Sequence, residues 1–185
     1  MGEMLMDLLN NSSVAAFVGA FSAFFLVALT DWRRRHRKKG LIKRRITTLK
    51  EIGIAKRETA HDFIKIIQKN QFDVAPVMKF PVDGLKSLQS DTLDVLSSTE
   101  INAIDTLIYW MESIDTLFER ARSIAEELAG MVKKDAPLHT RLPKKLEMLT
   151  EYNDIIKNIN VFENMSILYL KNEPQKILEF QDKNL

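Results

Sequence analysis

The sequence predicts an all-α protein in which a single N-terminal transmembrane helix is followed by a cytoplasmic helical bundle. Three observations support this prediction. Residues 12–30 contain no charged side chain, the block that follows Asp31 is strongly basic, and the rest of the chain has helical rather than alternating apolar periodicity. We expect residues 1–31 to hold an extracytoplasmic N-terminus and the anchor, residues 32–57 to start a basic juxtamembrane helix, and residues 58–185 to form the bundle.

The uncharged stretch has the length of a membrane crossing. About 19 residues at a rise of about 1.5 Å span roughly 28 Å, close to the thickness of the hydrocarbon core of a bilayer. A cleaved signal peptide is disfavoured, because the preceding residues carry Glu3 and Asp7 instead of a positive charge. The basic block after the stretch predicts that the N-terminus lies outside. The chain from Trp32 onward is then cytoplasmic, and the membrane is the inner membrane if the cell is bacterial.

Two sets of residues in and beside the anchor are candidate contact sites. Ala15, Gly19 and Ala23 recur every four residues and form a shallow groove for a second helix, which predicts self-association. Small residues are also common in membrane helices that remain single. The residues expected at the membrane interface, where cations attract anionic headgroups, are Trp32, Arg33, Arg34, Arg35, Arg37, Lys38 and Lys39. Because the membrane accounts for this cluster, nucleic acid is not an expected partner.

The charge of the chain is divided between two different regions. Residues 33–57 carry twelve Lys or Arg and one acid, Glu51, whereas residues 58–185 carry 15 basic and 21 acidic side chains, a balance of −6. The net charge of +2 is therefore an average of the two. The chain has no cysteine, which excludes disulfides and thiolate metal sites.

The chain after the basic block predicts three long helices and one short helix. The first covers residues 41–70, with a weak middle that predicts a kink or swivel at Gly53. Its apolar face consists of Ile42, Ile46, Leu49, Ile52, Ala60, Phe63 and Ile67. Pro76 and Pro81 then predict an extended connection, and the short helix follows over about residues 83–97.

The strongest pattern is a helix from a Thr99 cap to about Val132. Its apolar residues repeat every seven positions in two rows, which are Ile104, Met111, Phe118, Ala125 and Val132, and Leu107, Ile114, Ala121 and Leu128. Trp110, Leu117 and Ile124 widen this stripe beyond what one neighbouring helix covers, which favours a bundle and self-association. We interpret the acidic row opposite as a solvated face or as a surface for a basic protein partner: Asp105, Glu112, Glu119 and Glu126.

A polar connection over residues 133–145 leads to the third long helix, from about Pro143 to Lys171, whose predicted core stripe includes Leu146 and Tyr152. Cations at the start of a helix interact unfavourably with the positive end of its dipole, so the presence of Lys144 and Lys145 there needs an explanation. One reason is a phosphate or carboxylate bound beside free N-terminal amides. The candidate anion site is therefore His139, Arg141, Lys144 and Lys145. Loop lysines kept for solubility are the alternative interpretation.

No catalytic or metal-binding pattern accompanies these helices. The histidines His36, His61 and His139 do not complete a metal-ligand set, and every glycine is isolated, so we predict no enzyme, no metal and no cofactor. Residues 60–63, Ala-His-Asp-Phe, resemble the phosphoacceptor box of histidine kinases, which implies phosphorylation of His61. The chain has neither that family's following proline nor its ATP-binding domain.

These features predict a non-enzymatic single-pass membrane protein whose cytoplasmic module binds a protein partner or copies of itself. We expect it to act as an effector that perturbs the membrane when assembled, with anionic lipid headgroups and a second copy as its partners. The alternative is a membrane-anchored receptor or signalling protein that senses an anionic ligand such as a nucleotide.

Overall fold

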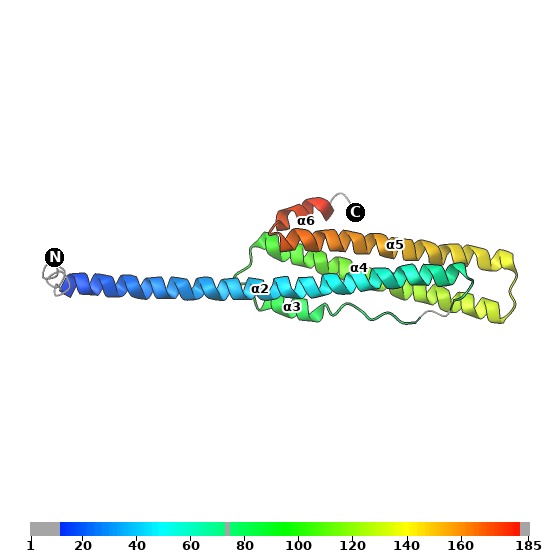
Figure 1. The fold of residues 1–185 in the computed structure, drawn as a ribbon, viewed down its shortest axis with the longest axis horizontal. Helices are drawn as coiled ribbons and strands as arrows, with labels where there is room; N and C mark the ends of the chain where they lie inside the picture. The colour runs from blue at the N-terminus through cyan, green and yellow to red at the C-terminus, as the bar shows by residue number, and fades with distance from the viewer. Residues whose placement is uncertain (1–11, 73–74, 182–185) are drawn as a thin grey trace. The chain divides into compact units, whose positions relative to one another are not determined.

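The computed structural model describes residues 12–72 and 75–181, and this part of the chain is all-helical without a strand. The helices in chain order are α2 (Ser12–Gln68), α3 (Asp83–Ser90), α4 (Ser98–Lys133), α5 (Leu138–Leu170) and α6 (Pro174–Gln181). Figure 1 shows this order along the chain. The all-α prediction is confirmed for the described residues.

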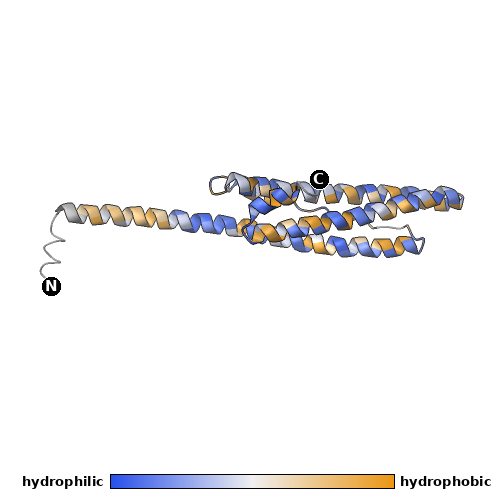
Figure 2. Ribbon diagram, turned by 90° about the horizontal axis from the view of Figure 1, so that it is seen from above, coloured by the Kyte–Doolittle hydropathy of each residue, from blue (hydrophilic) through white to orange (hydrophobic). Residues whose placement is uncertain are grey.

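The chain divides into two compact units, Met1–Gly40 and Leu41–Leu185. In the first unit the apolar part of α2 exposes its large side chains, among them Phe17, Phe21 and Phe24. Figure 2 shows this apolar stretch followed by a hydrophilic one. By length and composition, α2 is the one described helix that could cross a membrane. This helix is therefore a candidate membrane span, at the place that the sequence predicts.

The second unit is a bundle of three long helices: α2 from Leu41 onward, α4 and α5. The helices α4 and α5 are joined by a short loop, visible at the right of Figure 1, and pack against each other as a hairpin. Within this unit α2 runs antiparallel to α5, because Lys43 donates to the carbonyl of Leu170 near one end and Lys145 donates to Asn70 near the other. The short helices α3 and α6 pack against α4.

The predicted apolar faces are confirmed with small differences. On α2 the predicted face is buried except for Ile52, which is partly buried, and on α4 both seven-residue rows are buried except for Val132. Because α5, α6 and α3 all contact α4, its wide stripe is covered within one chain. On α5 the prediction of a buried Leu146 is wrong, since this side chain is exposed.

Three predicted helix ends differ from the structure. The cap of α4 is Ser97 instead of Thr99: its hydroxyl accepts from the Glu100 N–H, and the Glu100 carboxylate accepts from the Ser97 N–H. The helix α3 ends at Ser90, with turns up to residue 95, so the predicted helix to residue 97 is too long.

The start of α5 is the largest of these corrections. The helix begins at Leu138 rather than Pro143, and Pro143 lies inside it. A proline ring holds a helical φ, so Pro143 is accommodated near the start of the helix at the loss of one N–H donor. In the first turn of the helix the Thr140 and Arg141 N–H groups donate to the Pro137 carbonyl, and Lys144 and Lys145 lie in the following turn.

The helix α2 continues without a break through Gly53, contrary to the predicted kink or swivel. A β-carbon added at Gly53 would lie 3.1 Å from Cε1 of the buried Phe162 on α5. The glycine thus permits close contact between α2 and α5. That contact is a matter of packing and does not indicate a hinge.

Candidate functional site

An extended segment, residues 75–81, connects the end of α2 to α3, and we call it the strap. Pro76 and Pro81 keep it out of a helix, as predicted. Two side chains of the bundle hold its main chain. Lys56 of α2 donates to the carbonyl of Met78, and Asp115 of α4 accepts from the Phe80 N–H at 2.7 Å.

The two side chains that hold the strap also pair with each other. Lys56 Nζ lies 2.8 Å from Asp115 Oδ1, and Lys56 is only 4% exposed. The ammonium also lies 4.8 Å from the centroid of the Phe80 ring and 5.1 Å from that of Phe118. Because carboxylate, carbonyl and two aromatic faces surround it, this lysine is engaged within the fold.

The strap and α3 also contact the acidic row of α4. Lys79 pairs with Glu119 at 2.6 Å, and Lys86 pairs with Glu112 at the same distance. The hydrogen bond from Lys79 lowers the pKa of the Glu119 carboxyl. Asp105, at the other end of the row, accepts from Gln89 at 2.8 Å. All four side chains of the row are exposed, which confirms the prediction of a solvated face, and three of them also pair with side chains of the strap or of α3.

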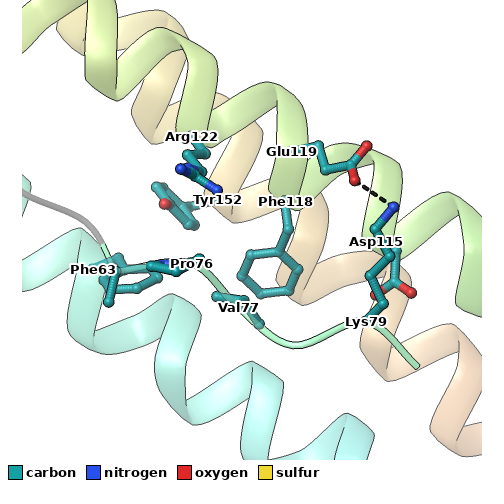
Figure 3. A pocket seen from close by; sticks show the side chains of 10 residues that line it. Phe63, Pro76, Val77, Lys79, Asp115, Phe118, Glu119, Arg122 and Tyr152 are labelled. Carbon is teal, nitrogen blue, oxygen red and sulfur yellow. Dashed lines mark ion pairs between the residues drawn. The ribbon is translucent and has the colours of Figure 1, made fainter. Parts of the chain in front are cut away.

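Figure 3 shows a small cavity beside the strap, about 130 Å³ in volume. The rings of Phe63, Phe118 and Tyr152 point into it, and the Lys79–Glu119 ion pair lies at its edge. Burial raises the pKa of the Tyr152 phenol well above its ordinary value. A wider cavity of about 590 Å³ lies between the strap and α2.

The predicted anion cluster is divided by the structure. Arg141 and Lys145 lie on the same face of α5, one turn apart, and line a cavity of about 410 Å³. Lys144 lies outside this cavity and pairs with Glu127 and Glu147, both at 3.1 Å, which raises its pKa. His139 is exposed and does not line the cavity.

The remaining walls of this cavity come from three parts of the sequence, and we call it the end cavity. The segment that follows α2 gives Asn70 and Phe72, the end of α4 gives Val132, and α5 gives Leu138 and Leu142. Sequence reasoning missed Asn70, Phe72 and Val132. The only local signal was the spacing of Leu138, Leu142 and Leu146, which marks an apolar row on the same helix as Arg141.

The candidate residues in and beside the anchor lie on exposed helix. Gly19 and Ala23 are exposed, and a β-carbon added at Gly19 meets no atom within 4 Å, while the side chain of Ala15 lies outside the described part of the structure. Trp32 is exposed and stacks on His36 at a centroid distance of 5.7 Å. The basic residues of the interface are exposed at Arg33, Arg34, Arg35 and Arg37 and partly buried at Lys38 and Lys39.

His61 of the four-residue phosphoacceptor resemblance is exposed on α2, beside an Asp62–Lys65 ion pair of 2.8 Å. Over residues 12–72 and 75–181 no group of His, Cys, Asp and Glu is arranged to hold a metal ion. Comparisons with protein-family models, with curated proteins and with solved structures give no match.

Proposed function

We propose that this chain is a single-pass membrane protein, with its N-terminus outside, whose cytoplasmic bundle is a non-enzymatic interaction module that self-associates. When assembled, the module acts as an effector that perturbs the membrane. The span supports the membrane part of this proposal, because α2 has an apolar, exposed stretch followed by a basic one.

The observation that carries the interaction part is an exposed row of leucines on α5. Leu138, Leu142 and Leu146 recur every four residues and are 70%, 50% and 56% exposed. Large apolar side chains gathered on one helix face are typical of an interaction surface. The wide stripe of α4 no longer supports self-association, because it is covered within the chain. The leucine row and the Gly19 groove remain as its two supports.

A fluorescence energy-transfer experiment in membranes tests self-association. The chain contains no cysteine, so a single cysteine in place of the exposed Asn153 accepts donor and acceptor dyes on separate copies. Co-reconstituted copies should transfer energy above the level set by random proximity. Leu142→Gln should reduce this transfer, and Gly19→Ile should reduce it independently by inserting bulk into the groove.

The matched control is Leu93→Gln, which changes an exposed leucine far along the chain from α5 and should leave energy transfer unchanged. Transfer at the random level in the wild type would refute self-association. Equal loss with Leu142→Gln and Leu93→Gln would refute the role of the leucine row. Release of a dye trapped in the same vesicles tests whether assembly perturbs the membrane.

A second candidate function, a membrane-anchored receptor for an anionic ligand, is favoured by one specific observation. Arg141 and Lys145 share the end cavity, and no carboxylate lines it. A cavity with convergent cations and apolar walls is the usual form of a small-molecule site. Titration of the full chain with nucleotides and acidic metabolites tests this candidate, and loss of binding on Arg141→Gln is the expected result.

A further inference from the structure

We infer that the end cavity binds an amphipathic anion, with a phosphate monoester or similar head beside Arg141 and Lys145 and an apolar body against Phe72, Val132 and Leu142. This inference deepens the receptor candidate and rests on it, because it names the class of ligand for the same site. It does not depend on self-association.

The charges in the cavity are uncompensated. Arg141 has no ion-pair partner among the described residues, and its Nε is buried without a hydrogen-bond partner there. A guanidinium is always charged, so Arg141 keeps its positive charge beside a cavity that no carboxylate lines. Lys145 donates at 2.8 Å to Asn70 Oδ1, which is a neutral acceptor and leaves the lysine charge in place.

The neighbouring Lys144 shows that the fold supplies carboxylates to lysines elsewhere on this turn. That lysine pairs with Glu127 of α4 and Glu147 of α5, and neither carboxylate lines the end cavity. Two cations therefore remain toward the cavity. A phosphate monoester carries a charge of about −1.5 to −2 at pH 7 and has three acceptor oxygens, which suits a site with two cations.

The walls and the size of the cavity define the rest of the ligand. Four of its seven lining residues are apolar: Phe72, Val132, Leu138 and Leu142. Its volume of about 410 Å³ lies within the range of drug-sized sites, about 300–1,000 Å³, so a bare phosphate leaves most of it empty. A ligand that fills it places an aromatic or short alkyl body against the leucines and the Phe72 ring. Burial of apolar surface adds to the attraction of the head.

The three chain segments that form the cavity are distant in sequence. The turn after α2, the end of α4 and the start of α5 meet only in the folded bundle. A ligand held by Arg141, Val132 and Phe72 therefore bridges α5, α4 and the segment that follows α2. Because it binds the folded state alone, it raises the melting temperature of the bundle as its concentration rises.

Calorimetric titration of the full chain in phosphatidylcholine nanodiscs tests the inference with 1-naphthyl phosphate as the probe. We expect one site per chain. Inorganic phosphate, which lacks the apolar body, and 1-naphthol, which lacks the charge, should each bind at least tenfold more weakly. Arg141→Gln should weaken binding of the probe at least tenfold, and Val132→Trp, which fills the cavity, should do the same.

The matched control is Lys157→Gln, which removes one positive charge from an exposed position of the same helix and should leave the affinity unchanged. Circular dichroism and the melting temperature establish that each variant is folded. Equal affinity of the wild type and Arg141→Gln, or of the probe and inorganic phosphate, would overturn the inference. Arg141-dependent binding of ATP without binding of 1-naphthyl phosphate would overturn this ligand class and keep the receptor function. Binding of neither would overturn both.

Discussion

Replacing Asp115 with Ala should destabilise the bundle far more than the loss of a surface ion pair. The substitution removes the 2.8 Å pair with Lys56 and the acceptor of the Phe80 N–H. Lys56 remains buried with only the Met78 carbonyl and two rings around its charge. Removal of one partner of a buried pair costs about 3–5 kcal/mol, a large part of the roughly 5–15 kcal/mol that stabilises a typical domain.

The double variant Lys56→Met/Asp115→Asn separates charge from contact. It removes both charges, keeps an acceptor for the Phe80 N–H, and should cost less than half as much as Asp115→Ala, although it alters two residues. Urea unfolding in detergent micelles measures both, with Trp32→Phe as the background so that the buried Trp110 is the only tryptophan. A cost below about 1 kcal/mol for Asp115→Ala would refute the reasoning, because the pair would then behave as an exposed one. A double variant as unstable as Asp115→Ala would refute it as well.

Three further predictions concern packing, ionisation and topology. Gly53→Ala should destabilise the bundle by about 1 kcal/mol, because the added β-carbon lies 3.1 Å from Phe162 and this crowding outweighs the gain in helix propensity. Gly130→Ala should stabilise it by about 0.5–1 kcal/mol, since nothing lies within 4 Å of its added β-carbon. Urea unfolding that gives both changes the same sign would contradict this prediction. Because the pKa of Tyr152 is raised in the folded chain, the stability that the neutral phenol contributes is complete below about pH 10 and is lost as the pH rises further. The melting temperature of Tyr152→Phe should therefore fall less than that of the wild type between about pH 9 and pH 11. An equal fall would show that another group is responsible. A cysteine at position 5 should react with an impermeant reagent outside intact cells and one at position 102 should not, and the opposite labelling would reverse the topology.

The sequence predicted the fold correctly where apolar residues repeat along one side of a helix, because that side is then buried. The rows on α4 are buried because a period of seven places them on one side of a helix, whatever packs against them. The same argument predicted Ile42, Ile46 and Leu49 on α2. Helix ends were less predictable. Pro143 is typical of the first turn of a helix and so predicted the start of α5 at this residue, whereas the structure accommodates it inside that helix.

The contacts that hold the strap could not be predicted in the same way. Lys56 belongs to a basic segment, and lysines in such a segment are usually exposed. Its burial depends on Asp115, 59 positions later, and on a main-chain carbonyl. Only the cationic residues of the end cavity were predicted. Arg141 and Lys145 stood out as cations near a helix start, whereas Phe72 is brought to them only by the antiparallel packing of α2 and α5.

The anchoring of the strap through main-chain atoms has a consequence for mutational tolerance. At Met78 the bundle uses the carbonyl alone, and the side chain is 85% exposed. Any residue supplies that carbonyl, so position 78 can accept a fluorophore, a biotinylated side chain or a charged residue while the strap keeps its path. Position 80 is the opposite case, because it contributes an N–H donor and a buried ring. Proline, which has no N–H, is the substitution that this position excludes most strictly.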